Sequence, residues 1–202
     1  RCSLDSSSHP TPQLRSPERV ADEVIALFKS PIAQGNHGEV VPQIDHALQA
    51  AQLARKANAR DGEVLAALLH DVGHFCEPDE NESVEGIGVA DHDDVGADYL
   101  RGMGFSEDVI DIVEGHVDAK RYLVSRDERY NGRLSDVSTR SLEAQGGAMT
   151  SEEATNFEKT TRFEEKLRVR AWDEQAKVPG AQVEPIEGYR DLLVRDLSRT
   201  SA

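Results

Sequence analysis

An apolar helical segment in the first half of the chain, AALLHDVGHF at residues 66–75, also carries His70, Asp71 and His74. A buried carboxylate without a partner costs several kcal/mol, so Asp71 requires a cation or a dense set of hydrogen bonds. Neighbouring residues of an α-helix point about 100° apart. His70 and Asp71 can therefore reach one metal only near a helix end, unless each serves a different ion or a bridge.

The rest of the chain has the apolar spacing of helices, without strand-like alternation or an internal repeat. Helices are expected at residues 17–29, 43–59, 62–75, 92–103, 106–120, 150–177 and 187–197, with irregular structure at 120–150. Ser16 is expected to cap the first helix, with Pro17 at its first position. The glycine pair in EAQGGAM (143–149) permits a left-handed turn, although a plain connector remains open. We expect one all-α domain over 17–202, after a Ser/Pro-rich, disordered segment at 1–16.

The formal net charge of -15 argues against binding to nucleic acids or anionic membranes, because both need a basic surface. No apolar run approaches the roughly 20 residues of a membrane span, and residues 1–17 lack the apolar core of a secretory signal. Cys2 and Cys76 do not have the spacing of a metal site, and Cys2 lies in the segment expected to be disordered. A reducing, cytoplasmic location is therefore expected.

Histidines gather on or beside the expected helices between residues 43 and 120. They are His46, His70, His74, His92 and His116. Any one of them could be an ordinary core or surface imidazole. Helical bundles, however, build metal sites from inward-pointing histidines and carboxylates on separate helices. The group as a whole, with Asp71 among it, therefore favours a metal centre.

The pattern of His46, the pair His70-Asp71 and a distal Asp173 in RAWDEQ resembles the HD-domain metalloprotein superfamily. His92 and His116 resemble the additional ligands of its dinuclear members. Four segments are similar to the mixed-valent diiron oxygenases of this superfamily: GEVVPQIDHALQAAQLARK, GHVDAKRYL, LSDVSTRSLEAQGGAMT and RVRAWDEQAK. Within that group the chain looks most like the enzymes that cleave the carbon–phosphorus bond of 1-hydroxyphosphonates, such as 2-amino-1-hydroxyethylphosphonate. The resemblance implies a single HD-domain helical bundle around a dinuclear site.

What the resemblance implies for the site can be stated residue by residue. The ligands of two iron ions, Fe(II) and Fe(III), would be His46, His70, Asp71, His92, His116 and Asp173, with Asp71 as the bridge. The substrate would be bound by Glu39, His74, Lys120, Ser138 and Arg170, with no catalytic side chain beyond the metal centre. Glu39 matches the glutamate that meets a substrate amino group, but Asn36 stands where the family has a lid tyrosine. The amino end of the substrate is therefore left open, including a larger cation or no amine at all.

Helical spacing independently supports an anion site beside these ligands, because residues three or four apart share a helix face. The pairs are His116 with Lys120, Arg170 with Asp173, and His70 with His74. A dianionic phosphonate needs cationic neighbours, and an arginine can offer it charge-assisted, often bidentate contacts. The alternative is that Lys120 and Arg170 are solvated charges on a highly charged surface.

The expected reaction is therefore oxidative cleavage of a small anionic hydroxyphosphonate by O2, giving a carboxylic acid and phosphate. An upstream hydroxylase would produce the substrate. Two other functions remain open. One is an HD phosphohydrolase that acts on a nucleotide or a phosphate ester, in which two metals activate water. The other is a non-catalytic module that senses a metal or a ligand. Nitrogen and oxygen ligands suit iron, manganese and zinc alike, so residue types alone do not identify the metal.

Overall fold

The computed structural model describes residues 15–36, 39–76, 83–84, 88–89 and 91–200, which are mostly helical and confirm the all-α class. The α-helices are α1 (Pro17–Phe28), α2 (Gln43–Lys56), α3 (Asp61–Leu69), α4 (His92–Met103), α5 (Glu107–Glu114), α6 (His116–Arg126), α7 (Glu128–Asn131), α8 (Asp136–Ala144), α9 (Ser151–Phe157), α10 (Phe163–Gln175) and α11 (Arg190–Thr200). Short 3₁₀ helices are η1 (Ile32–Gln34), η2 (Val72–Phe75) and η3 (Ile186–Tyr189). In the described part of the chain, no helix combines the length and apolar character needed to cross a membrane.

Two very short strands, which the sequence did not predict, pair antiparallel in the connection between η2 and α4. They are β1 (Ser83–Val84) and β2 (Gly88–Val89), with Ser83 opposite Val89. At the N-terminal end, the expected cap of α1 is confirmed: the Ser16 hydroxyl accepts a hydrogen bond from the backbone nitrogen of Arg19 at 3.3 Å. Most of the segment expected to be disordered, residues 1–14, lies outside the described residues.

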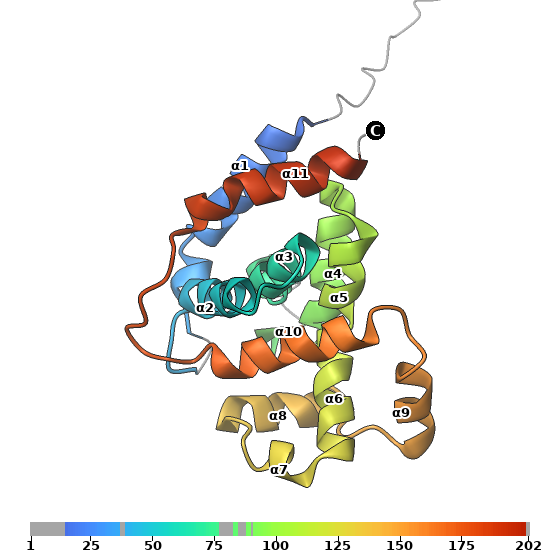
Figure 1. Cartoon of the computed structure of the whole chain (residues 1–202). Coiled ribbons are helices and arrows are strands. Elements are labelled where there is room, and N and C mark those ends of the chain that lie inside the picture. The colour runs from blue at the N-terminus through green and yellow to red at the C-terminus, as the bar shows by residue number, and fades with distance from the viewer. Residues whose placement is uncertain (1–14, 37–38, 77–82, 85–87, 90, 201–202) are drawn as a thin grey trace, which may run out of the picture.

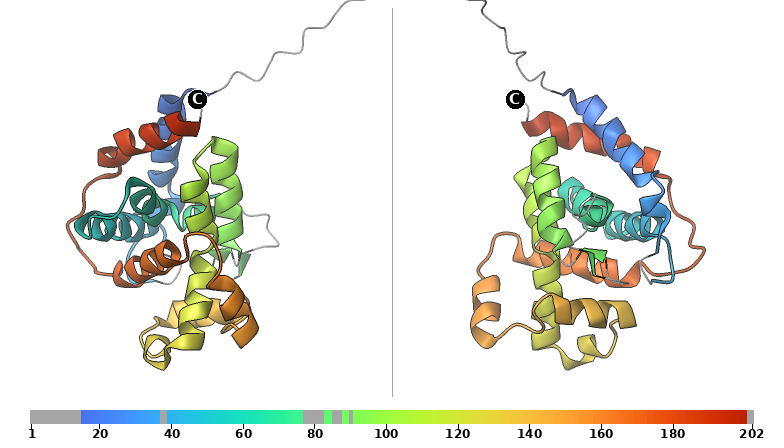
Figure 2. Two further views of the ribbon diagram at one scale, coloured as in Figure 1. Left: turned by 45° about the vertical axis from the view of Figure 1, so that its right-hand side comes forward. Right: turned by 180° about the vertical axis from the view of Figure 1, so that it is seen from behind.

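Helix α3 lies in the middle of the bundle (Figure 1). Residues 64–69 are all buried, which agrees with an apolar sequence that has no polar face. Helices α2, α5 and α10 pack against α3, and α4 packs against α5. Helices α1 and α11 lie side by side across one end of the bundle, while α6 to α9 form the opposite end (Figures 1 and 2). The central helix therefore carries its C-terminal residues into a region enclosed by several other helices.

The helix expected at 62–75 is interrupted. Helix α3 ends at Leu69, His70 follows as its C-cap, and the chain turns at Asp71 into η2. A Cβ atom on Gly73 would overlap the carbonyl oxygen of His92, so the backbone of η2 lies directly against the start of α4. His70 and Asp71 consequently occupy a helix end, where neighbouring side chains can reach one centre.

Three further helix predictions were partly wrong, because packing between helices breaks segments with continuous helical patterns. The helix expected at 106–120 is divided at Gly115 into α5 and α6, and a Cβ on Gly115 would collide with the side chain of Lys166 on α10. The helix expected at 150–177 is divided into α9 and α10, with Arg162 in the left-handed region (φ 52°) just before α10. The C-terminal helix expected at 187–197 begins as η3 and continues as α11 to Thr200.

The region expected to be irregular, residues 120–150, instead contains most of α6, together with α7 and α8. Its glycine turn is confirmed, since Gly146 and Gly147 have φ values of 94° and 74°. A separate apolar cluster that includes Ala119 on α6, Met149, and Phe157 on α9 holds this end of the bundle together. Helix α8 is linked to α6 by the hydrogen bond from Lys120 Nζ to the hydroxyl of Ser141.

Candidate active site

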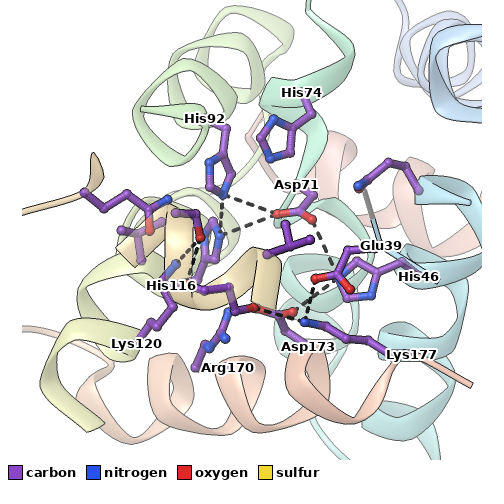
Figure 3. Close-up of a pocket in the computed structure, with 16 residues that line it drawn as sticks. Glu39, His46, Asp71, His74, His92, His116, Lys120, Arg170, Asp173 and Lys177 are labelled. Atoms are coloured by element: carbon purple, nitrogen blue, oxygen red, sulfur yellow. Dashed lines mark hydrogen bonds and ion pairs between the residues drawn. The ribbon is translucent and has the colours of Figure 1, made fainter. Parts of the chain in front are cut away.

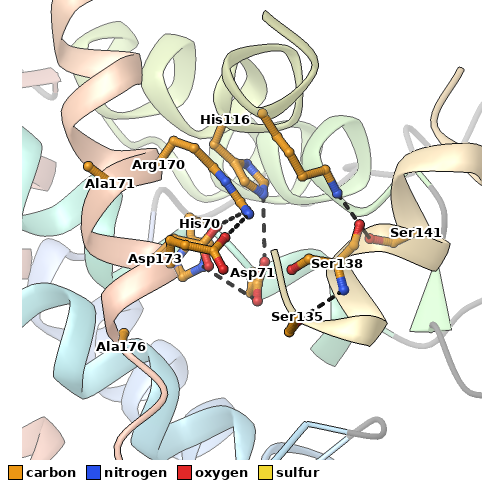
Figure 4. A network of polar contacts seen from close by, with 12 residues as sticks. His70, Asp71, His116, Ser135, Ser138, Ser141, Arg170, Ala171, Asp173 and Ala176 are labelled. Carbon is orange, nitrogen blue, oxygen red and sulfur yellow. Dashed lines mark hydrogen bonds and ion pairs between the residues drawn. The ribbon is translucent and has the colours of Figure 1, made fainter. Parts of the chain in front are cut away.

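One group of ligand-type atoms lies where α2, α3 and α10 meet (Figure 4). His46 Nε2 is 3.1 Å from His70 Nε2 and 3.2 Å from Asp173 Oδ1. Asp71 Oδ2 lies 3.6 Å from His46 Nε2 and 3.4 Å from His70 Nε2. Ligands that bind one ion at about 2.1 Å are themselves about 3 Å apart. The spacing of this group is therefore that of a metal coordination sphere.

A second group lies beside the first, at the start of α4 and the start of α6 (Figure 3). His92 Nε2 is 3.0 Å from His116 Nε2. Asp71 Oδ1 lies 3.3 Å from His92 Nε2 and 3.6 Å from His116 Nε2. Asp71 thus directs one carboxylate oxygen at each group, which is the arrangement of a carboxylate that bridges two ions.

Backbone carbonyls orient three of these histidines. His46 Nδ1 bonds to the carbonyl oxygen of Ala176 at 2.9 Å, His70 Nδ1 to that of Ala67 at 2.9 Å, and His116 Nδ1 to that of Val113 at 2.6 Å. A carbonyl oxygen can only accept, so Nδ1 carries the proton and Nε2 of the neutral ring presents a lone pair. In the His46–His70 pair two such lone pairs face each other across 3.1 Å. A cation held between the rings would remove this repulsion.

The two aspartates remain ionised although both are enclosed. Burial alone would raise the pKa of Asp71, but the adjacent imidazoles of His70, His116 and His92 hold it well below its usual value. Burial would likewise raise the pKa of Asp173, but the charge of Arg170 outweighs this effect and holds the pKa well below its usual value. Burial lowers the pKa of His70 to about 4, so this ring is neutral at pH 7. Neutral nitrogen donors and buried carboxylates form a donor set suited to divalent and trivalent first-row metals.

A cavity of about 70 Å³ opens onto these atoms and is lined by five of the six expected metal ligands, the exception being His70. All five residues expected to bind the substrate also line it: Glu39, His74, Lys120, Ser138 and Arg170. Figure 3 shows the labelled members of this group around the ligand cluster. The structure thus brings together expected site residues that lie up to 134 positions apart in the chain, from Glu39 to Asp173.

Lys120 lies one turn after His116 on α6, as its spacing predicted, and only 3% of its surface is exposed. Its Nζ donates a hydrogen bond to the hydroxyl of Ser141 on α8 at 3.0 Å. Burial and then the charge of Arg170 lower the pKa of Lys120 to about 7. Within the described part of the chain, no carboxylate forms an ion pair with this amine, so it can receive an anionic ligand.

Arg170 is more engaged than the sequence suggested (Figure 4). Its Nε donates to the hydroxyl of Tyr130 on α7 at 2.7 Å, and its two terminal nitrogens donate to Asp173 and Glu174. The charges of Asp173, Tyr130 and Glu174 raise its pKa although burial would lower it. Arg170 therefore positions Asp173 in addition to lining the cavity.

His74 does not share an α-helical face with His70, because residues 72–75 form a 3₁₀ helix; that prediction was wrong. Its ring instead stacks on His92, with centroids 4.1 Å apart and planes at 19°. Potential ligand atoms of Asp71, His74 and His92 lie within 4.8 Å of one another. His74 is thus placed beside the second group, at the wall of the cavity.

Sequence reasoning missed Lys177, which follows α10 and lines the cavity. Its Nζ donates to Glu39 Oε1 at 3.0 Å and to the Ser138 hydroxyl at 3.1 Å. The signal available in the sequence was the position of Lys177 four residues after Asp173. Asn36, at the position of the family's lid tyrosine, is exposed, and its backbone carbonyl accepts a hydrogen bond from the backbone nitrogen of Glu39 at 2.7 Å.

Similarity to known proteins agrees with this geometry. The HD domain family matches residues 44–155. The chain is 40% identical over 171 residues to the hydroxymethylphosphonate dioxygenase of Gimesia maris, covering 83% of this chain and 85% of that protein. It is 37% identical over 140 residues to the glycine-betaine-forming 1-hydroxy-2-(trimethylamino)ethylphosphonate dioxygenase of Leisingera caerulea, covering 69% and 71%. An uncharacterised protein of Acanthamoeba polyphaga mimivirus is 36% identical over 165 residues, covering 81% and 75%. The chain therefore belongs to the HD-domain family of phosphonate oxygenases.

Proposed function

We propose that this protein is a diiron oxygenase that uses O2 to cleave the carbon–phosphorus bond of a 1-hydroxyphosphonate. For a substrate R–CHOH–PO3²⁻, addition of O2 balances to R–COO⁻, HPO4²⁻ and one proton. Because such a substrate already carries the hydroxyl on carbon 1, an upstream hydroxylase would supply it from the parent phosphonate.

The observation that carries the proposal is the placement of Asp71 between two groups of ligand atoms beside a cationic cavity. His46, His70 and Asp173 would hold one ion with Asp71 Oδ2, while His92 and His116 would hold the other with Asp71 Oδ1. Two irons bound there would supply one-electron chemistry with O2, in the mixed-valent state that the family resemblance implies. Burial of both aspartates as carboxylates supports a bound cation in each group.

The chain's own residues would bind and orient the substrate. Protonated Lys120 would neutralise one phosphonate oxygen, and the hydroxyl of Ser138, which lines the cavity from α8, would donate a further hydrogen bond. Arg170 contributes charge from α10 while its bond to Asp173 keeps that carboxylate aimed at the first group. The enclosure of the cavity strengthens these interactions, because charges interact more strongly where water is excluded.

A dinuclear phosphohydrolase could use the same ligands to activate water, so the geometry alone is compatible with both reactions. The names of two relatives favour the oxygenase, because both are phosphonate dioxygenases. A non-catalytic sensor has no need for buried cations beside a complete ligand set.

Anaerobic reconstitution with Fe(II), followed by partial oxidation and EPR, tests the metal centre with and without a phosphonate. In the same preparation, O2 uptake and phosphate release should match one to one for at least one 1-hydroxyphosphonate. Oxygen from labelled O2 should appear in the carboxylic acid. Release of phosphate from esters only, at the same rate without O2, would assign the protein to the hydrolases.

A further inference from the structure

A half-buried ion pair forms one wall of the cavity. Lys177 Nζ lies 3.0 Å from Glu39 Oε1, and both side chains are mostly enclosed, with 14% and 16% of their surfaces exposed. Lys177 also donates to the hydroxyls of Ser135 and Ser138, at 3.2 and 3.1 Å. Ser135 in turn donates to the same oxygen of Glu39 at 2.8 Å. Glu39 and Lys177, which are 138 positions apart in the sequence, are therefore held together at the cavity wall (Figure 3).

This pair determines the charge that a ligand meets. The carboxylates among the described residues of the cavity wall are Glu39, Asp71 and Asp173. Asp71 and Asp173 face the metal-type groups, so Glu39 is the carboxylate left to attract a cationic substituent, and Lys177 already neutralises it. The nearby amide oxygen of Gln43 is buried, lines the cavity and has no hydrogen-bond partner among the residues that the structure describes. This wall thus offers a neutral acceptor beside a carboxylate that is already paired with a lysine.

The size of the cavity also limits which substituents a substrate can carry. A volume of about 70 Å³ corresponds to roughly five to seven water-sized positions, since one water needs about 10–15 Å³ by this measure. Hydroxymethylphosphonate has only six non-hydrogen atoms, whereas 2-amino-1-hydroxyethylphosphonate and its trimethylammonium analogue carry an additional aminomethyl or trimethylammoniomethyl cation on carbon 1. An ammonium group near Glu39 would also lie next to Lys177, and such like-charge contacts are strongly unfavourable.

We propose that Lys177 is a specificity-determining residue that excludes cationic substituents, so that the substrate is a small 1-hydroxyphosphonate without an ammonium group. The proposal rests on the proposed function, because it concerns the substrate of the same cavity. Lys177 acts by occupying Glu39, and by placing a positive charge where the ammonium of a larger phosphonate would have to bind.

The test compares kcat/KM for hydroxymethylphosphonate and 2-amino-1-hydroxyethylphosphonate in the iron-loaded wild type and Lys177→Gln. The wild type should favour hydroxymethylphosphonate, and Lys177→Gln should shift the ratio toward the amino substrate by about tenfold or more. Because the gain requires a free Glu39, the Glu39→Gln/Lys177→Gln double variant should lose it. Calorimetric affinities of zinc-loaded proteins for the two compounds provide a readout that does not depend on turnover, and should shift in the same direction.

The matched control is Lys166→Gln, which removes another enclosed lysine of the α10 region that pairs with Asp111 outside the cavity. Its substrate ratio should equal that of the wild type. Lys177→Arg, which keeps the charge, should also retain the wild-type preference and serves if Lys177→Gln does not fold.

A wild type that prefers the amino substrate, or a ratio unaffected by Lys177→Gln, would overturn this inference alone. Failure of the iron-loaded wild type to oxidise any hydroxyphosphonate would instead refute the proposed function and this inference with it.

Discussion

Gly73 packs directly on the backbone of His92. A Cβ atom at Gly73 would overlap the carbonyl oxygen of His92 and lie 2.9 Å from the backbone nitrogen of Gly96. These are backbone atoms of α4, so they cannot move aside as a flexible side chain would. The contact fixes the distance between η2, which follows the bridging Asp71, and the helix that presents His92.

Gly73→Ala should therefore displace α4 and weaken the second group of ligands. We expect lower metal content and a lower Tm than in the wild type, because overpacking of a tight contact costs about 1–3 kcal/mol. Gly102→Ala is the matched control on α4, since no atom lies within 4 Å of its Cβ position. That variant should be as stable as the wild type or more stable by up to about 1 kcal/mol. Wild-type metal content in Gly73→Ala would contradict the role of this contact.

Asp71→Ala should lose both ions, whereas Asp173→Ala should lose one. The reason is that Asp71 directs an oxygen at each group, while Asp173 Oδ1 lies near only His46 and His70 among the described histidines. Metal analysis after anaerobic loading with Fe(II) distinguishes the two outcomes. Two bound ions per chain in Asp71→Ala would show that its carboxylate is not a bridge.

Lys120→Ala and Arg170→Ala should differ in their effects on iron. Lys120 bonds to Ser141, so its loss should leave the ions bound and raise KM roughly ten- to a hundredfold, the effect of losing a charge-assisted contact worth about 1.5–3 kcal/mol. Arg170 bonds to Asp173, so its loss should reduce iron content as well as substrate affinity. Iron content and steady-state kinetics, measured on the same preparations, separate these effects. Unchanged kinetics in Lys120→Ala would exclude a role in substrate binding.

Substrate affinity should depend on pH through Lys120, whose pKa is lowered from 10.5 to about 7 by burial and the charge of Arg170. Below this pKa the amine is charged and attracts the phosphonate. Above it the amine is neutral, and the free protein must take up a proton before Lys120 can attract the phosphonate. KM should therefore rise as the pH increases through 7. In Lys120→Arg the cation stays charged, so KM should rise less. Parallel profiles of wild type and Lys120→Arg would show that the dependence comes from the substrate alone.

Several features of the site could be predicted from residues that lie close together in the sequence. The ligand types and their spacing around His70 and Asp71 indicated a metal centre, and the His116–Lys120 pair was correctly placed because both residues lie within one helix. The helix breaks near Asp71 and at Gly115 could not be predicted from the helical pattern, because they lie at close contacts with α4 and with Lys166 of α10. The assignment of the six ligands to iron and of five residues to substrate remains a prediction, which the variants above test.

The sequence alone determined which side chains can bind a metal or an anion and where most helices begin, since those properties depend on residue type and on contacts within a few positions. Only the tertiary structure decided that Asp71 directs its two oxygens at different groups, and that Lys177 neutralises Glu39 across 138 positions of the chain. Contacts of that kind leave no local pattern, because they arise when helices distant in sequence bury their apolar faces against α3. The burial of those faces holds the enclosed charges at fixed distances from one another.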